Sequence, residues 1–295
     1  MPAPGVSMRT ALVGLDLSRV SDLFVEWLPN LARLRTTTLL LMHVVPVEKL
    51  EHVAGGYPVD RLEEELVREA RRRLEEYAER LRGSGFAVEV LSPVVGEPAP
   101  VLAEKALEHG ADYVAVASRG RGWLRSILLG STAEELANVS RVPVLVAKGF
   151  KRLTEKGAEL GAAPGWAPGP VVAGIDFSEY SPVVLGYAAY AAAALGRGLL
   201  LVHVVEPGVD RGEAAEELAR YGEEARRLGL EQVETLLVEA EKPSKALVRV
   251  SEERDAALIV VGPGRRRESL LLGTTSEAVL RRAGRHVLVA KKPRG

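Results

Sequence analysis

The chain has 295 residues, a length that fits two domains of about 150 residues, each large enough to bury its own core. With 47% hydrophobic and 27% charged residues, its composition is that of a globular protein rather than a disordered or fibrous one. A net charge of −1 argues against a protein that wraps nucleic acid, and the absence of cysteine excludes disulfides, thiol nucleophiles and cysteine-ligated metals.

The first residues lack the basic and apolar segments of a secretory signal. No apolar run reaches the roughly 18 residues that span a membrane. We therefore expect a cytoplasmic protein that has neither nucleic acid nor a membrane as a partner.

Short aliphatic runs alternate with longer amphipathic segments, the pattern of β-α-β units in a parallel sheet covered on both faces. Asp60 and Glu63 form a capping box that begins a helix ending at Gly83, and a second helix opens at Pro98 and closes at Gly110. The strands expected in the first half are 11–15, 38–45, 87–91, 113–117 and 144–147.

A segment rich in glycine, alanine and proline, 150–169, follows with no sustained apolar period, so we expect a linker. This division predicts two domains, 8–149 and 170–293. The strands expected in the second half are 171–175, 199–205, 232–238, 257–261 and 286–290.

The second half repeats the first. TALVGLDLS (10–18) matches PVVAGIDFS (170–178), and LLLMHVVP (39–46) matches LLLVHVVE (199–206), both 160 residues further on; later the offset falls to 143. The sequence thus predicts two tandem α/β domains, each a doubly wound, Rossmann-like sheet of five parallel strands. Ligands of such sheets bind beyond the carboxyl ends of the strands, where the strand order reverses.

The most specific local feature follows the fourth strand of the first repeat. Gly120 is separated by nine residues from Gly130, and Ser131 and Thr132 then begin a helical pattern. Glycine lets backbone amides approach a phosphate, while hydroxyls and the helix amino end supply donors. Alternatively, Ser131 and Glu134 form a capping box that simply begins the helix. From spacing alone, both interpretations stay open.

With this loop, the chain resembles the universal stress proteins in their tandem form. Their nucleotide-binding members carry a G-x2-G-x9-G-[S/T] loop, an aspartate in a D-x-S turn after the first strand, and a histidine followed by aliphatic residues after the second. The first repeat has ASRG, nine residues and GST, DLS at 16–18 and HVV at 43–45, and departs only at Ala117, which replaces the first glycine. The resemblance covers nearly the whole chain and implies an adenine nucleotide alpha hydrolase-like fold.

In members that bind ATP, the aspartate lies near the ribose and adenine, the backbone beside the histidine contacts the base, and the loop holds the phosphates. The resemblance therefore implies a nucleotide site made of Asp16, Val44, Ala117, Gly120, Gly130, Ser131 and Thr132. Taken alone, Asp16 could instead hydrogen-bond its own turn or cap the next helix. His43 is expected to be a packed, hydrogen-bonded core residue.

The second loop is shorter: Gly262 and Gly273 are 11 residues apart where the pattern needs 13, and Thr274 with Glu277 forms a capping box. We expect the phosphate site of this repeat to be remodelled. Its less favoured candidates are Asp176, Val204, Gly262, Gly264, Gly273 and Thr274.

The sequence contains no Walker loop, no dinucleotide fingerprint after the first strand and no close metal spacing among its five histidines. The resemblance implies binding of ATP, or of AMP or ADP, with Mg²⁺ as an accompanying ion, mainly in the first domain and with a regulatory or stress-response role. Catalysis is not the evident task. The alternatives are a nucleotide-free interaction scaffold, favoured by Ala117 and the short second loop, and a slow ATPase, for which Asp16 is the best candidate base.

Two repeats in one chain resemble the homodimer common in this family, in which the final strands of the two modules pair. VPVLVAK (142–148) and HVLVAKK (286–292) are the candidate strands for such an intramolecular pseudo-dimer. A homodimer of the whole chain is a further expected assembly.

Overall fold

The computed structural model describes residues 5–47, 59–118, 131–154, 157–160, 165–208, 210–263 and 272–292. The first repeat contains β1 (Thr10–Gly14), α1 (Arg19–Trp27), the 3-10 helix η1 (Leu28–Leu34), β2 (Thr38–Met42), β3 (Val44–Pro46), α3 (Val59–Arg82), β4 (Ala87–Val90), β5 (Val94–Gly96), α4 (Pro98–Glu108), β6 (Tyr113–Ala117), α5 (Ser131–Val139) and β7 (Val144–Ala147). Next come β8 (Lys151–Thr154) and β9 (Gly157–Leu160). The second repeat contains β10 (Val171–Gly174), α6 (Ser181–Leu195), β11 (Leu199–Val205), α7 (Arg211–Arg227), β12 (Val233–Glu239), α8 (Pro243–Glu253), β13 (Leu258–Val261), α9 (Thr274–Arg282) and β14 (Val287–Val289).

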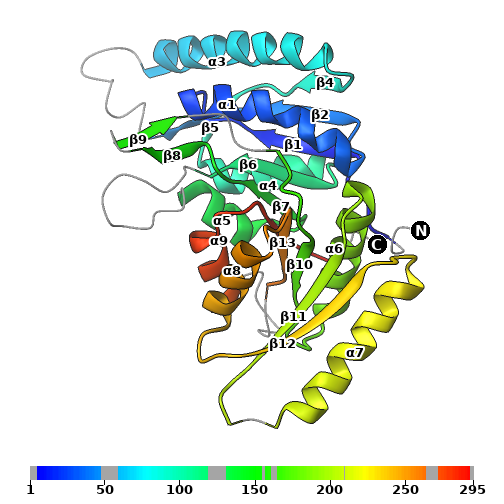
Figure 1. The fold of residues 1–295 in the computed structure, drawn as a ribbon. Helices are drawn as coiled ribbons and strands as arrows, with labels where there is room; N and C mark the ends of the chain where they lie inside the picture. Colours follow the sequence, from blue (N-terminus) through cyan, green and yellow to red (C-terminus); the bar gives the residue numbers. More distant parts are fainter. Residues whose placement is uncertain are drawn as a thin grey trace.

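Ten of the described strands form one sheet, in the order β12-β11-β10-β13-β14-β7-β6-β1-β2-β4 (Figure 1). Within each repeat the five neighbouring strands are parallel, as the sequence predicts. Among the ten described strands of this sheet, only β14 and β7, where the repeats meet, pair antiparallel. The strand order reverses at β1, which lies between β2 and β6, and at β10, which lies between β11 and β13. These reversals put the candidate ligand sites beyond the carboxyl ends of β1 and β10.

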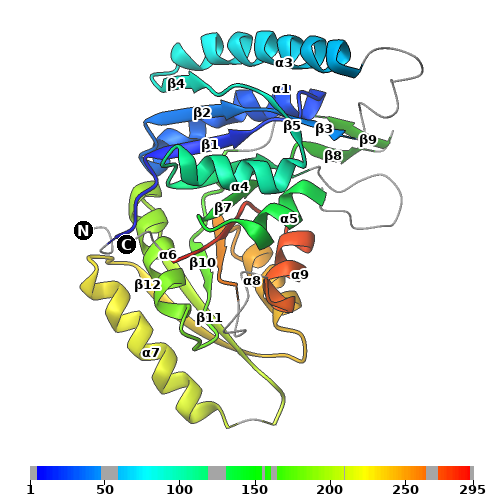
Figure 2. The ribbon, with the colours of Figure 1, turned by 180° about the vertical axis from the view of Figure 1, so that it is seen from behind.

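Helices cover both faces of the sheet (Figures 1 and 2). One face carries α1, η1, α3, α6 and α7, and the other carries α4, α5, α8 and α9. Strands such as β7 and β13 are therefore buried at every residue, which explains their continuous aliphatic sequences. None of the described helices combines the length and apolar character needed to cross a membrane.

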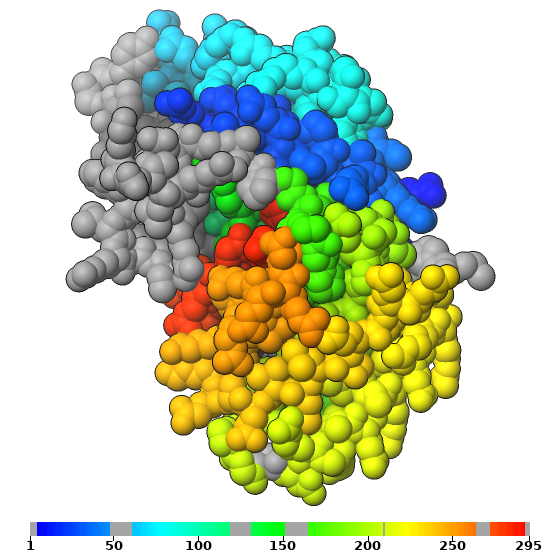
Figure 3. All heavy atoms as spheres, viewed as in Figure 1, coloured from blue at the N-terminus to red at the C-terminus, as the bar shows by residue number. Residues whose placement is uncertain are grey.

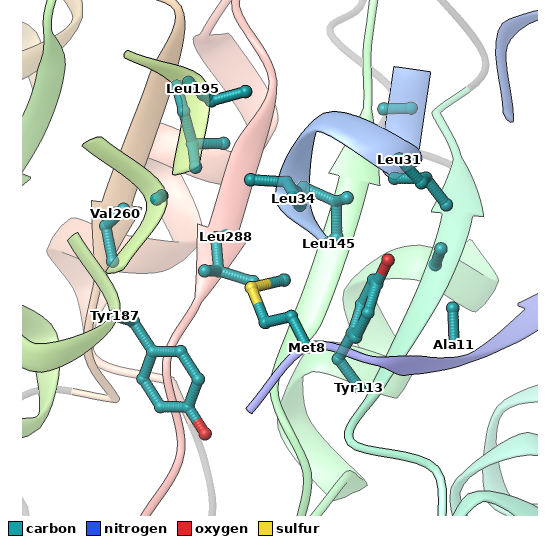
Figure 4. Close-up of a cluster of buried hydrophobic side chains, with 14 of the residues drawn as sticks. Met8, Ala11, Leu31, Leu34, Tyr113, Leu145, Tyr187, Leu195, Val260 and Leu288 are labelled. Carbon is teal, nitrogen blue, oxygen red and sulfur yellow. The ribbon is translucent and has the colours of Figure 1, made fainter. Parts of the chain in front are cut away.

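The two repeats share one apolar core where they meet. Leu145 of β7 lies opposite Leu288 of β14, and Met8 and Leu34 belong to the same buried cluster (Figure 4). Tyr190 of α6 also crosses the boundary, because its hydroxyl donates to the Leu34 carbonyl at 3.0 Å. Figure 3 shows the resulting shape, with the first repeat (blue to green) stacked on the second (yellow to red).

Some element boundaries differ from the sequence prediction. The strand expected at 38–45 is interrupted at His43, and β3 pairs with β5 in a separate two-stranded sheet. The helix α3 begins at Val59, one residue before Asp60. The segment expected to be a linker contains the antiparallel pair β8 and β9, and its Trp166 is only 6% exposed.

Candidate functional site

At the carboxyl end of β1, Asp16 lies in a tight turn. Its Oδ1 accepts the Ser18 backbone N–H at 3.0 Å and the Ser21 hydroxyl at 2.7 Å. Leu17 between them has φ = 57°, a left-handed conformation that is uncommon for a branched residue. Ser18 rather than Asp16 caps α1, by accepting the Val20 N–H. Asp16 thus hydrogen-bonds its own turn, yet the residue remains exposed at the point where the strand order reverses.

The second repeat builds the same turn from a different sequence. Asp176 Oδ1 accepts the Ser178 N–H at 3.0 Å and the Ser181 hydroxyl at 3.1 Å. Phe177 has φ = 58°, nearly the value of Leu17. The D-x-S sequence therefore specifies a defined backbone turn in both repeats.

Both second-strand histidines are structural. His43 Nδ1 lies 2.6 Å from the Leu15 carbonyl, and His203 Nδ1 lies 2.7 Å from the Ile175 carbonyl. Because a carbonyl only accepts, each Nδ1 carries the proton. The rings are buried, as expected of packed core residues, and each fastens one strand end to the next. Val44, which follows His43, is buried in β3, whereas its counterpart Val204 is half-buried.

The first candidate phosphate loop is anchored at both described ends. Ala117 is the half-buried last residue of β6, and the Ser118 N–H donates to the Ala147 carbonyl at 2.8 Å. At the other end, Ser131 is the exposed first residue of α5 and Thr132 is half-buried. Gly120 and Gly130 lie outside the described residues.

Hydrogen bonds join the described ends of the second loop. The Gly273 N–H donates to the Pro263 carbonyl at 2.5 Å, and the Ser276 hydroxyl donates to the Gly262 carbonyl at 2.5 Å. A Cβ atom at Gly262 would lie 3.0 Å from Val184 Cγ2, so close packing on α6 gives this glycine a structural reason. Gly264 lies outside the described residues.

The capping box expected at Thr274 is wrong. The N-cap of α9 is Gly273, no side chain caps this end, and Thr274 is already helical. Thr274 and Glu277 instead line a cavity of about 250 Å³ that runs along α9 as far as Arg282. At α5, Glu134 forms an ion pair with Arg281 of the other repeat. Within the described ranges, no three histidine, aspartate or glutamate side chains are grouped so that they could hold a metal ion.

Comparison with known proteins assigns the fold. A family model described as the universal stress protein family matches residues 8–148 and 169–291. The chain belongs to the universal stress protein family. It is 30% identical over 301 residues to a universal stress protein of Mycobacterium tuberculosis (strain ATCC 25618 / H37Rv), an alignment that covers 95% of this chain and 96% of that relative.

A solved universal stress protein from Archaeoglobus fulgidus DSM 4304 shows the same architecture. It is 25% identical with a TM-score of 0.77, and the match covers 97% of this chain and 99% of that one. A universal stress protein from Archaeoglobus fulgidus in complex with dAMP is 26% identical with a TM-score of 0.36, over 41% of this chain and 97% of that one.

Different types of side chain lie against the two D-x-S turns of this universal stress protein. In the first repeat, the Arg73 guanidinium of α3 donates to the Leu17 carbonyl and to the Tyr77 hydroxyl. In the second, the Phe177 ring stacks on His203 with centroids 3.9 Å apart, and Tyr221 of α7 lies 6.0 Å beyond. A cation thus lies beside the first turn, whereas aromatic rings cover the second.

The sequence motifs do not point to Arg73. It lies 56 residues from the turn that it contacts, in a helix crowded with charged residues. The sequence offers one indication of this contact. Arg73 and Tyr77 are four residues apart, which places both side chains on one face of α3.

Proposed function

We propose that this universal stress protein binds ATP, or the related AMP or ADP, mainly in its first repeat, and that it has a regulatory or stress-response role. The difference between the two loops carries the proposal. In the second repeat, the Gly273 amide already donates to the Pro263 carbonyl, and the Gly262 carbonyl already accepts the Ser276 hydroxyl of α9. The first repeat keeps the 13-residue spacing and has Ala133 at the position of Ser276, so it lacks the hydroxyl that joins the described ends of the second loop.

In the proposed complex, the exposed Asp16 carboxylate accepts hydrogen bonds from the ribose, and the backbone of Val44 contacts the base. The phosphates lie at the amino end of α5, where amides and hydroxyls favour an anion. The residues assigned to the phosphates are Ala117, Gly120, Gly130, Ser131 and Thr132. Mg²⁺ would accompany the nucleotide mainly through phosphate oxygens, because it rarely uses an all-protein cage. The secondary candidates, in the second repeat, are Asp176, Val204, Gly262, Gly264, Gly273 and Thr274.

We also propose that residues 8–149 and 170–293 are two domains joined by the linker 150–169, and that together they form an intramolecular pseudo-dimer. The antiparallel pairing of β7 with β14 supports this assembly. A homodimer of the whole chain, tested by light scattering, and a cytoplasmic location, tested by cell fractionation, complete the proposal.

The first test is nucleotide carried through purification. The purified protein is denatured and the released material is analysed by chromatography, and ATP is then titrated into nucleotide-free protein by calorimetry. We expect binding that Gly130→Val abolishes, because its side chain occupies the space of the phosphates, and that Gly273→Val leaves unchanged. No binding at millimolar ATP contradicts the proposal.

The hydrogen bonds at the described ends of the second loop favour a second candidate function for that repeat, namely an interaction scaffold without nucleotide. Equal loss of binding in Gly130→Val and Gly273→Val would contradict this division between the repeats. Slow ATP hydrolysis is tested by phosphate release, and a rate equal to that of Gly130→Val excludes it.

A further inference from the structure

Two equivalent glutamates lie where the two helices begin. Glu134 is in the first turn of α5, and Glu277, its counterpart 143 residues later, is in the first turn of α9. A carboxylate there stabilises a helix through the helix dipole. The same charge repels a phosphate that approaches the same helix end.

Arg281 forms ion pairs with both carboxylates. The Arg281 guanidinium pairs with Glu134 across the boundary between the repeats, where its Nε lies 3.1 Å from Glu134 Oε1. It also lies 2.9 Å from Glu277 Oε1 in its own helix. These contacts hold the Arg281 pKa above its ordinary value, chiefly through the hydrogen bond to Glu134.

The position equivalent to Arg281 is Asn138, which is neutral. Its Oδ1 accepts the Leu272 N–H at 2.7 Å, so this side chain also crosses to the other repeat, where it holds the residue before Gly273. The contact between α5 and α9 is therefore asymmetric. Each helix contributes one first-turn carboxylate, but only α9 contributes an arginine at the equivalent position, where α5 has Asn138.

We propose that Arg281 of the second repeat is a positioning residue for the nucleotide site of the first: it neutralises Glu134, so that a phosphate group can approach the amino end of α5. This inference rests on the proposed binding of adenine nucleotide to the first repeat. It assigns to the second repeat a role that does not require a ligand of its own.

The test compares ATP binding by calorimetry in the full-length protein and in Arg281→Gln. Removal of Arg281 leaves the Glu134 charge uncompensated, and we expect ATP affinity to fall about three- to tenfold at low salt. The loss should shrink near 1 M salt because exposed charges are screened. Arg282→Gln is the matched control, since it removes the same charge from the next residue, for which the described structure shows no ion pair; we expect a change below about twofold.

The double variant Glu134→Gln/Arg281→Gln separates charge from architecture. If Arg281 acts by neutralising Glu134, the double variant regains the wild-type affinity within about twofold. Unchanged affinity in Arg281→Gln, or a loss that Glu134→Gln does not restore, overturns the inference while nucleotide binding itself stands. Absence of ATP binding in the wild type contradicts the proposed function, and this inference with it.

Discussion

The Lys148 backbone N–H donates to His286 Nδ1 at 3.0 Å, across the boundary between the two repeats. The same imidazole contacts two indole rings, with centroid distances of 4.8 Å to Trp27 and 5.1 Å to Trp166. A single side chain of the second repeat thus contacts the residue after β7, the helix α1 and the linker. The boundary between the repeats therefore contains a specific hydrogen bond and aromatic contacts in addition to apolar packing.

Replacing His286 with alanine should destabilise the protein. The ring is 4% exposed, so its removal leaves a cavity and takes the acceptor from the Lys148 amide. We expect the free energy of unfolding to fall by about 2–4 kcal/mol, measured by urea denaturation. His109→Ala, at an exposed position, is the control and should change it by less than about 0.5 kcal/mol. Equal effects of the two variants would show that the contact contributes nothing.

Some contacts at this boundary could be predicted from the sequence, and others could not. The pairing of β7 with β14 is the one that the resemblance to tandem universal stress proteins implies for the final strands of the two repeats. The position of Trp166 could not be predicted, because its segment has no apolar period and its partners come from both repeats. Local alternation predicts strands and helices, whereas contacts between segments far apart in the chain leave no pattern.

At the candidate site, too, some contacts could be predicted from the sequence and others could not. The turn at Asp16 and the burial of His43 follow from the residue types and their neighbours. The pairing of Glu134 with Arg281 could not be predicted, since the sequence already offered a local interpretation of that glutamate as half of a capping box with Ser131. The structure shows the competing interaction because it brings α9 against α5.

Lys291, the counterpart of Lys148 in the second repeat, should make stability depend on alkaline pH. Burial lowers its pKa to about 8, from 10.5 for an exposed lysine. Between these values the unfolded chain binds more protons than the folded one, so the free energy of unfolding rises with pH. Relative to Lys291→Met, the wild type should gain about 2–3 kcal/mol between pH 8 and pH 10.5, measured by denaturation at each pH.

Lys148→Met is the control for this pH dependence. The Lys148 amine donates to the Leu280 carbonyl at 2.5 Å, so its removal should destabilise the protein by about 1–3 kcal/mol. Relative to wild type, this variant should keep the alkaline rise that Lys291→Met loses. Identical pH profiles of the wild type and Lys291→Met would contradict the assignment.

The Tyr77 hydroxyl joins α3 to α1. It donates to Asp22 Oδ1 and accepts from Arg73 at 2.9 Å, and burial and the bond to Asp22 raise its pKa above the ordinary value. Tyr77→Phe should lower the free energy of unfolding by about 1–2 kcal/mol near pH 7. Since the folded pKa is raised above the unfolded value of 10, the contribution is complete below pH 10 and is lost progressively as the pH rises from 10 to the folded pKa. A variant as stable as wild type at pH 7 would show that the hydrogen bonds of the Tyr77 hydroxyl make no net contribution to the free energy of unfolding.

Gly169, the last residue of the linker 150–169, tests how closely the chain packs where it enters the second repeat. A Cβ atom there would lie 2.1 Å from the Arg254 carbonyl oxygen and 2.4 Å from that of Asp255, and backbone atoms cannot rotate away. The Gly169 N–H also donates to the Asp255 carbonyl at 3.0 Å, which fixes this close approach. We expect Gly169→Ala to lower the free energy of unfolding by at least about 2 kcal/mol.

Gly83→Ala is the matched control for Gly169→Ala, because its added Cβ meets only the Arg80 carbonyl oxygen at 3.5 Å, an ordinary contact. Alanine at this position should change the free energy of unfolding by less than about 1 kcal/mol, since it also restricts the unfolded chain. Chemical denaturation of both variants decides the matter. Comparable stabilities would mean that the turn between α8 and β13 shifts at little cost in free energy. The close approach of Gly169 to this turn would then contribute little to stability.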